Sequence, residues 1–406
     1  MNLLIFSKHY YPEPFLIDEL AVEIRKHIKN VYIITSQPHY PEGRYYKGYN
    51  LFSFSKEKRN GMNIYRVPVI PRFASSFIYI SLNYLFFIFI SFFAAAYIVA
   101  SKKITHIFVY ATSPMYQTFS VLVLRWINQL KIIMWVQDIF PDDAANNGYL
   151  KNKFAINFFR KTNNFLFSNV DLILLQSKGF KESIDSRFHG KIRYFPNPCK
   201  FESDTKPILN RKLTQIFKKN KFYISVTGNI GISQDFDTLI EAAYILQNEK
   251  KNNSIHFVIV GTGSSFIYLS RKVASLRLKN ITMTGFLDKI YMPFIYSNSN
   301  ALYSGLLDRK TFNQVIPYRV SSYMTSGKPI IASIGGETKK LILDAKCGFS
   351  NQPEHPISLA NLFLRISKLP SSKLESMGKN GFIYASKNFD IKSNVVRLIQ
   401  LMKALS

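Results

Sequence analysis

Two stretches of the chain combine glycine turns with residue types that bind phosphate. Residues 227–242, TGNIGISQDFDTLIEA, place Gly228 and Gly231 between an apolar run and a helical pattern. Residues 316–337, IPYRVSSYMTSGKPIIASIGGE, carry Arg319 and end in a second glycine turn. A buried strand that runs through a glycine turn into a helix presents unpaired backbone amides to an anion. The two stretches therefore predict a phosphate site with a guanidinium beside it.

The elements that must hold these residues follow from the hydrophobic pattern. Residues 222–226 and 330–333 are short apolar runs and predict buried strands. Phe236, Leu239 and Ile240 fall on one face of a helix that follows the first turn. Strand candidates alternate with helical patterns along the rest of the chain, which predicts an α/β fold with doubly wound parallel sheets.

Length and composition set the domain organisation. The 406 residues, of which 47% are hydrophobic, can form two cores of ordinary size. We expect a first domain over residues 1–198, a polar linker over 199–220 and a second domain over 221–385, with 386–406 forming a helix that returns to the first domain. The two cysteines lack metal or redox spacing, and the apolar N-terminus is expected to be a first strand rather than a signal peptide. A cytoplasmic protein is predicted.

The order of short motifs adds a family resemblance. The second half contains GNIGxxQ followed by DTLIEAA, and IPxRVxSYMxxGKPIIA followed by GE. The first half contains YPE, PHYPEG, TSPM, VQDIFPDDAA and FPN at residues 11–13, 38–43, 112–115, 136–145 and 195–197. Together these motifs resemble family-4 GT-B glycosyltransferases, above all the bacterial subgroup that builds O-antigen, capsular or colanic-acid polysaccharides. The matches extend over nearly the whole chain.

The resemblance implies a fold and an activity. The fold is GT-B, with two Rossmann-like domains facing a central cleft. The implied reaction moves a sugar from a nucleoside diphosphate, with a UDP-sugar favoured, to a polyprenyl-diphosphate-linked saccharide acceptor, with retention at the anomeric carbon. It needs neither a metal nor another cofactor.

Site residues follow from the matched motifs. We expect Asp138, Glu337 and Arg319 to be catalytic, and Asp18, His39 and Ser113 to lie on the acceptor side. The expected donor-binding residues come from the turns and helix starts of the second domain: Gly228, Asn229, Gln234, Gly263, Phe286, Leu287, Arg319, Ser322, Tyr323 and Gly336. Many family members carry two glutamates where this chain has Gln314 and Ser322, so the carboxylate contacts to sugar and ribose depart from the family's pattern.

Charge and one apolar segment indicate a membrane surface. Lys and Arg number 53 against 25 Asp and Glu, a formal charge of +28, which attracts polyanions. No nucleic-acid module accompanies it, and nucleic acid is not an expected partner. Residues 73–101 contain no charge, and we expect them to dip into the cytoplasmic leaflet without crossing it, through Phe86, Phe87 and Phe92. The alternative is a helix buried between the domains.

Two other functional classes remain open at this stage. The neutral residues at the glutamate positions are also compatible with a non-catalytic GT-B scaffold in a polysaccharide assembly complex. The charge alone is compatible with a polyanion-binding protein. The donor sugar, the linkage and the oligomeric state depend on side-chain geometry that the sequence does not specify.

Overall fold

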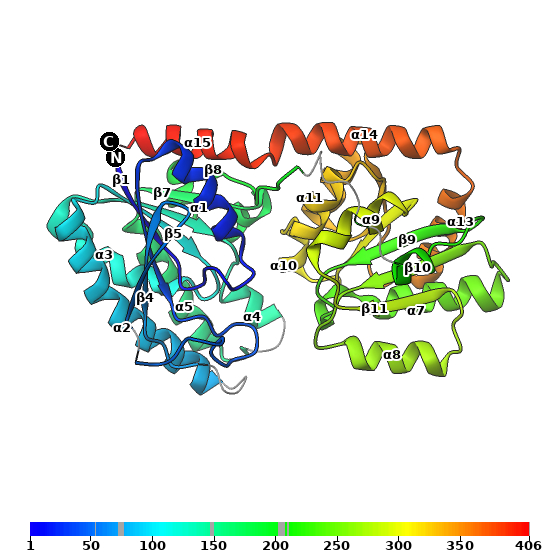
Figure 1. The fold of residues 1–406 in the computed structure, drawn as a ribbon, viewed down its shortest axis with the longest axis horizontal. Helices are drawn as coiled ribbons and strands as arrows, with labels where there is room; N and C mark the ends of the chain where they lie inside the picture. The colour runs from blue at the N-terminus through cyan, green and yellow to red at the C-terminus, as the bar shows by residue number, and fades with distance from the viewer. Residues whose placement is uncertain (53, 72–76, 147–149, 202–207, 209–210, 406) are drawn as a thin grey trace. The chain divides into compact units, whose positions relative to one another are not determined.

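The computed structural model describes residues 1–52, 54–71, 77–146, 150–201, 208 and 211–405. The chain forms two compact units, one of residues 1–198 with 391–406 and one of residues 199–390 (Figure 1). Residues 73–76 of the expected membrane segment, and 202–207 and 209–210 of the expected linker, lie outside the described residues. The chain re-enters the first unit at Ile391.

The first unit contains an eight-stranded sheet in the order β3-β4-β2-β1-β5-β6-β7-β8, parallel except for the β3–β4 pair. Its strands are β1 (Asn2–Phe6), β2 (Asn30–Ser36), β3 (Ser55–Arg59), β4 (Met62–Val67), β5 (His106–Ala111), β6 (Lys131–Val136), β7 (Leu172–Leu175) and β8 (Ile192–Tyr194). The central strand β5 is buried along its whole length. Both of its faces are covered, which explains its continuous apolar run.

Helices cover both faces of this sheet. They are α1 (Leu16–His27), α2 (Phe77–Lys102), α3 (Phe119–Asn128), α4 (Asp142–Asn146), α5 (Lys153–Ser168) and the C-terminal α15 (Ile391–Lys403). Helix α1 packs against α15, and Val395, Leu398 and Met402 of α15 are buried in the core of this unit. Helix α2 packs against α3. The crossovers that contain α2, α3 and α5 all run in one direction along the sheet, so these three helices lie on the same face.

The second unit contains a six-stranded parallel sheet in the order β11-β10-β9-β12-β13-β14. Its strands are β9 (Phe222–Thr227), β10 (Ile255–Val260), β11 (Ile281–Gly285), β12 (Ala301–Gly305), β13 (Ile330–Ser333) and β14 (Gly348–Ser350). Strands β9 and β13 confirm the two strands expected around the glycine turns. Both units thus have the doubly wound α/β class that the sequence predicted.

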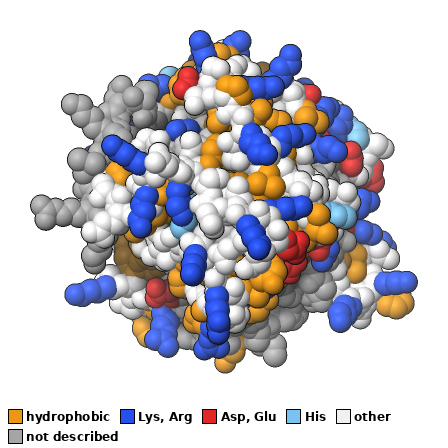
Figure 2. All heavy atoms as spheres, turned by 90° about the vertical axis from the view of Figure 1, so that its right-hand side faces the viewer, with side chains coloured by type: hydrophobic (Ala, Val, Ile, Leu, Met, Phe, Trp, Pro, Cys, Tyr) orange, Lys and Arg blue, Asp and Glu red, His pale blue; other side chains and the backbone are white. Residues whose placement is uncertain are grey.

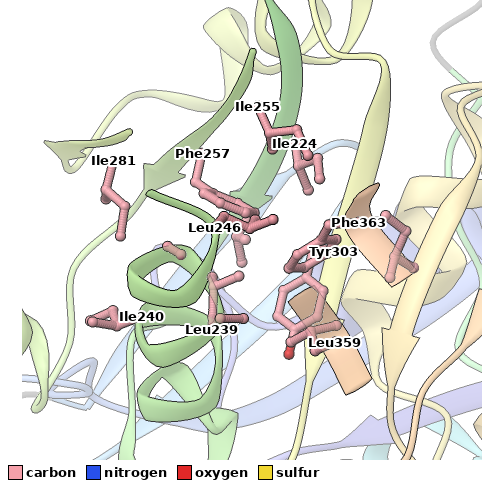
Figure 3. Close-up of a cluster of buried hydrophobic side chains, with 14 of the residues drawn as sticks. Ile224, Leu239, Ile240, Leu246, Ile255, Phe257, Ile281, Tyr303, Leu359 and Phe363 are labelled. Atoms are coloured by element: carbon pink, nitrogen blue, oxygen red, sulfur yellow. The ribbon is translucent and has the colours of Figure 1, made fainter. Parts of the chain in front are cut away.

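Helices precede, connect and follow the strands of the second unit. They are α6 (Arg211–Thr214), α7 (Phe236–Tyr244), α8 (Phe266–Ser275), α9 (Met292–Ser297), α10 (Lys310–Asn313), α11 (Tyr318–Thr325), α12 (Gly336–Asp344), α13 (Pro356–Ser367) and α14 (Ser371–Asn388). Figure 3 shows how Leu239 and Ile240 of α7 meet Phe257 and Phe363 in one apolar cluster. The rings of Phe257 and Phe363 lie 5.0 Å apart. This packing fixes α7 against the sheet.

The strand orders locate where a ligand can bind in each unit. In the second unit the chain runs from β9 to β10 on one side and later continues at β12 on the other. In the first unit β1 likewise lies between β2 and β5. Ligands of doubly wound sheets bind beyond the carboxyl ends of the strands at such switch points. The loops after β9 and after β5 and β6 are therefore the expected ligand-binding positions.

Candidate functional site: a phosphate cradle and a polar sheet edge

The turn after β9 packs directly on the turn after β10. Gly261 has φ +138°, and a Cβ on it would lie 1.9 Å from the carbonyl oxygen of Gly228. A Cβ on Gly263 would lie 2.4 Å from the oxygen of Ile230 and 2.6 Å from Oδ1 of Asn229. Only glycine allows this approach, because any side chain would occupy the space of the neighbouring backbone. The two turns therefore form one rigid unit of backbone amides and carbonyls.

Replacing Gly261 by alanine is expected to separate these turns. The added methyl group cannot avoid a backbone oxygen, so we expect a loss of at least about 3 kcal/mol in the free energy of unfolding. Gly285 offers a matched control, since it also has positive φ, +74°, but a Cβ there meets nothing within 4 Å. Gly285→Ala should lose only about 1 kcal/mol from backbone strain. Equal losses in urea denaturation would contradict the close-approach argument.

Arg319 lies against this turn, as the sequence predicted. It belongs to the first turn of α11, and its Nη2 donates a hydrogen bond of 2.7 Å to the carbonyl oxygen of Asn229. The guanidinium also covers Gly228, where a Cβ would lie 3.3 Å from Nη2. The second terminal nitrogen, Nη1, is buried and has no hydrogen-bond partner among the described residues. A buried charged donor without an acceptor is costly, and an anionic oxygen would satisfy it.

Two phenols support the turn from behind. The hydroxyl of Tyr323 accepts a hydrogen bond of 2.7 Å from the backbone N–H of Thr227. The hydroxyl of Tyr296 lies 3.0 Å from the hydroxyl of Thr227. Burial raises the pKa of both tyrosines, so both remain protonated. Tyr323 is fully buried. We expected it to contact the donor, but its buried hydroxyl is engaged by Thr227, so in this structure Tyr323 positions the turn.

The remaining expected donor residues lie on the loops at the same edge of the sheet. Asn229 contributes its backbone oxygen to Arg319, and Gln234 ends the short helical turn before α7. Phe286 follows β11 and is 75% exposed, and Leu287 packs on a small apolar cluster of this unit. Ser322 lies on α11 beside Tyr323 and is half-buried. The structure thus gathers these residues on one face without assigning a ligand contact to each.

The second glycine turn also lies at this edge of the sheet. Gly336 has φ +52°, and a Cβ on it would lie 1.9 Å from the carbonyl oxygen of Asn313. Helix α12 begins at Gly336, so Glu337 stands in its first turn, half-buried. An acidic residue there is also stabilised by the positive end of the helix dipole.

In the first unit, Asp138 follows β6 and meets the loop after β5. Its Oδ2 accepts a hydrogen bond of 3.4 Å from the backbone N–H of Ser113. Burial, assisted by the carboxylate of Asp143, raises the pKa of Asp138 to about 6. A carboxylate whose pKa lies near neutrality is suited to exchange a proton with a hydroxyl group. Ser113 links this site to α2, since its carbonyl oxygen accepts a hydrogen bond of 2.8 Å from Tyr84.

His39, which we expected on the side that binds the acceptor substrate, is engaged inside the protein in this structure. Its side chain is buried, its Nδ1 lies 2.9 Å from the carbonyl oxygen of Gln37, and its Nε2 lies 3.2 Å from Nδ2 of Asn83. Burial lowers the pKa of His39 to about 4, which keeps the ring neutral. Both ring nitrogens therefore have partners inside the protein. His39 packs the loop after β2 against α2.

Asp18 is also engaged within the protein. Its Oδ1 forms an ion pair of 2.5 Å with Nη1 of Arg59 on β3, and that guanidinium lies 3.4 Å from the ring centroid of Tyr11. Asp18 thus links α1 to the edge of the sheet, and its expected place on the acceptor side stays a prediction. The sequence pattern could not reveal this pair, because its members are 41 positions apart.

Glu13 is a buried carboxylate that the sequence analysis quoted in a motif but did not assign. Its Oε1 accepts hydrogen bonds of 2.7 Å from the backbone amides of His39 and Tyr40, and its Oε2 lies 2.7 Å from Nδ1 of His9. Burial alone would raise the pKa of Glu13, but His9 and the amide of His39 outweigh burial and lower it. The YPE and PHYPEG motifs therefore bind each other.

Helix α2 has one buried and one exposed side. Phe87 is fully buried, with its ring 5.9 Å from that of Phe6, so the structure corrects its expected membrane contact. Phe86 and Phe92 are half-buried. The outward stripe consists of other residues, at helical spacing and between 45% and 64% exposed: Leu82, Leu85, Phe89, Phe93 and Tyr97. Within the described part of the chain, one helix, Tyr79–Lys102, is long and apolar enough to cross a membrane.

Comparison with known proteins supports the geometric interpretation. Residues 210–405 match the family model described as glycosyl transferases group 1. The curated protein "Probable glycosyltransferase WbjE" of Pseudomonas aeruginosa is 22% identical over 271 residues, a match that spans 65% of this chain and 66%, just under two thirds, of that relative.

Solved structures match over the whole length. HepE of Anabaena in complex with UDP has a TM-score of 0.69 and is 13% identical in sequence. The match covers 100% of this chain and 100% of that one. Sucrose-phosphate synthase of Thermosynechococcus elongatus has a TM-score of 0.76 and 14% identity, with 100% of this chain and 99% of that one covered. These likenesses confirm the predicted GT-B fold. Residues 210–405 thus match the model of the group 1 glycosyl transferases, in agreement with the predicted family and enzyme class.

Proposed function

We propose that this protein transfers a sugar from a nucleoside diphosphate, preferably UDP, to a lipid-linked saccharide during the assembly of a surface polysaccharide. The observation that carries the proposal is the unpartnered Nη1 of Arg319 beside the glycine turn after β9. A diphosphate supplies the anionic oxygens that this nitrogen lacks. The UDP in the HepE complex supports the choice of nucleotide, and the motif resemblance to O-antigen and capsule enzymes supports the choice of acceptor.

The proposed chemistry assigns each group a role. As the bond from the anomeric carbon to the diphosphate breaks, negative charge grows on the leaving phosphate. Arg319 and the backbone amides around Gly228 and Gly336 stabilise that charge without a metal ion. Asp138 orients the acceptor hydroxyl and takes its proton while the new glycosidic bond forms. We propose retention of configuration, as the family resemblance implies, with no other cofactor.

A non-catalytic scaffold is the second candidate. It is favoured by Gln314 and Ser322, which stand where many family members carry glutamates. Neutral side chains at these positions remove two carboxylates that could bind sugar or ribose hydroxyls. A scaffold would still bind the nucleotide through Arg319, so nucleotide binding alone does not separate the two candidates. Turnover of a nucleotide sugar does.

One experiment tests both candidates with the full-length protein. Thermal unfolding is measured with UDP, GDP and dTDP, and release of the nucleoside diphosphate is then measured from the matching sugar donors. A ligand present at 100 times its dissociation constant stabilises the native state by about 2.7 kcal/mol, which is readily measured. Stabilisation by UDP with release of UDP supports the enzyme, whereas stabilisation without release over long incubation supports the scaffold. If no nucleotide stabilises the protein, the phosphate site is wrong.

We further propose that the protein attaches peripherally to the inner face of the cell membrane through the layer of α2, α3 and α5. The exposed stripe of α2 continues across Val123 of α3 to Phe158 and Phe165 of α5, all of them exposed. Phe119 of α3 stacks on Phe165 with ring centroids 6.1 Å apart, so these helices are neighbours. Exposed Lys153 and Lys161 on α5 supply positive charge beside the apolar stripe. An aromatic surface flanked by lysines suits an anionic leaflet.

The excess of positive charge extends beyond this surface. Figure 2 shows a different face of the molecule, where lysine and arginine side chains are widely spread and acidic ones are few. The net positive charge of the protein therefore attracts it to any anionic surface. The apolar stripe determines which face of the protein inserts into the membrane. This division separates the membrane proposal from a charge-led polyanion-binding protein.

Replacing Leu85, Phe89 and Phe93 together by glutamine is expected to weaken binding to vesicles of phosphatidylglycerol and phosphatidylethanolamine at least tenfold. Each buried side chain of this kind contributes about 1.5–3 kcal/mol when it leaves water. The matched control replaces Ile267 and Tyr268, two exposed apolar residues of α8, by glutamine and should bind like the wild type. Vesicle co-sedimentation measures both. Equal losses in the two variants would show that the α2 stripe is not the contact.

A further inference from the structure

The carboxyl edge of the first unit's sheet carries a row of buried polar atoms without hydrogen-bond partners. The atoms are Thr112 Oγ1, Gln137 Nε2, Ser177 Oγ and Asn197 Oδ1, and none has a partner within the part of the chain that the structure describes. Gln137 is 8% exposed and Ser177 is fully buried. Such atoms are rare in folded proteins, because each one loses its hydrogen bonds to water without compensation. We call these four residues the polar row.

Strand pairing places the residues of the polar row at neighbouring strand ends. Val136 of β6 pairs with Ala111 of β5 and with Leu175 of β7, and Leu175 pairs with Tyr194 of β8. The four residues follow the ends of these four adjacent strands within one to three positions. Backbone and side-chain contacts connect them further: Gln176 Nε2 donates to the carbonyl oxygen of Gln137 at 3.2 Å, and Asn197 Nδ2 donates to Oε1 of Gln176 at 3.4 Å.

The chemistry of the polar row selects one class of ligand. It offers an amide donor, an amide acceptor and two hydroxyls that can do both. A phosphate would require donors, and a metal ion would require acceptors only. Sugar hydroxyls donate and accept at once, and they match a neutral mixed set. The carboxylate of Asp138, next to Gln137 in the chain, adds the acceptor that a reacting hydroxyl needs.

We infer that the polar row is a saccharide subsite, which holds hydroxyl groups of the acceptor sugar next to Asp138. This inference rests on the proposed function and specifies it, since it places the acceptor on Thr112, Gln137, Ser177 and Asn197 in place of Asp18 and His39. The diphosphate and lipid of the acceptor lie outside this neutral row. The row recognises the sugar, and Asp138 acts on the hydroxyl that the row presents.

The first test measures the thermal stability of variants that lack the unpartnered polar atoms. Ser177→Ala and Gln137→Met remove polar atoms that lack partners, so the ligand-free variants should unfold about 2 °C above the wild type. Ser120→Ala is the matched control in the same unit: Ser120 is also buried, but its Oγ donates to the carbonyl oxygen of Ile88 at 3.0 Å. That variant should unfold below the wild type. Ligand-induced shifts by UDP are measured on the same full-length samples.

Saccharide binding is measured by saturation-transfer NMR with methyl pyranosides of glucose, galactose and N-acetylglucosamine. The wild type should bind at least one of them, and each polar-row variant should weaken that binding about tenfold, while Ser120→Ala leaves it unchanged. Lower unfolding temperatures in the polar-row variants overturn the inference, as does an unchanged or absent saccharide signal while UDP still stabilises the protein. Loss of the UDP response in the wild type contradicts the proposed function instead, so the two failures are distinguishable.

Discussion

Replacing Arg319 by alanine is expected to lower the rate of sugar transfer about 100-fold and to remove most of the stabilisation by UDP. Removing one fixed donor to a developing anion typically lowers turnover by a factor of about 10² to 10³. Here the donor is charged, is held by a 2.7 Å hydrogen bond to the oxygen of Asn229, and has a buried nitrogen that lacks a partner among the described residues. Release of UDP and thermal unfolding with UDP measure the two effects.

Two controls accompany this prediction. Arg365→Ala removes another arginine of the same unit, which is exposed and lies over the ring of Phe349, and should leave both measurements unchanged. Arg319→Lys keeps the charge but loses the planar fork, so we expect an intermediate effect. If the alanine variant still released UDP at the wild-type rate, the assignment of Arg319 to the diphosphate would be wrong.

Replacing Asp138 by asparagine is expected to lower transfer at least 100-fold and, above pH 6, to stabilise the protein. A positioned acid or base accelerates proton transfer by a factor of about 10² to 10⁴. Burial raises the pKa of Asp138 from 3.8 to about 6, so the folded state disfavours the charged form. The wild type therefore has its full stability below pH 3.8 and loses part of it as the pH rises to 6. Asparagine removes this loss.

The size of the stabilisation has an upper limit. A shift of two pKa units corresponds to about 3 kcal/mol. Asp138 is half-buried by solvent accessibility, which reduces that figure. Unfolding in urea at pH 4 and pH 8 should show a gain for Asp138→Asn at pH 8 alone. The wild-type rate should fall below about pH 6 as the carboxylate becomes protonated. Asp142→Asn breaks an exposed ion pair with Arg160. It should change the free energy of unfolding by no more than about 0.5 kcal/mol at either pH and leave the pH dependence of the rate unchanged.

Local patterns predicted the elements of the second unit well, since each glycine turn of the candidate site lies between its own strand and helix in sequence. A strand, a glycine turn and a helix follow each other within residues 222–244, and the same order recurs over residues 330–344. Glycine positions and apolar periodicity specify such segments directly. The close approach of Gly261 to Gly228 and the meeting of Arg319 with Asn229, 90 positions away, required the tertiary fold. The motif order indicated that meeting through the family resemblance.

The side-chain partners in the first unit were predicted less well, because they are distant in sequence. Asp18 and His39 have the residue types of a site, yet Arg59 and Asn83 engage them inside the protein. The polar row shows the reverse case: threonine, glutamine, serine and asparagine at four separate strand ends give no local signal. Their proximity depends on the pairing of β5, β6, β7 and β8.

The amino-acid sequence by itself determined the α/β class, the alternation of strands and helices, the two glycine turns and the apolar character of α2. These properties depend on residues a few positions apart, and backbone geometry translates them directly into structure. Tertiary structure alone decided which side of α2 is exposed, which carboxylates are paired and which buried polar atoms lack partners. Those properties depend on packing between segments that are dozens to hundreds of positions apart, and no short window of residues contains that information.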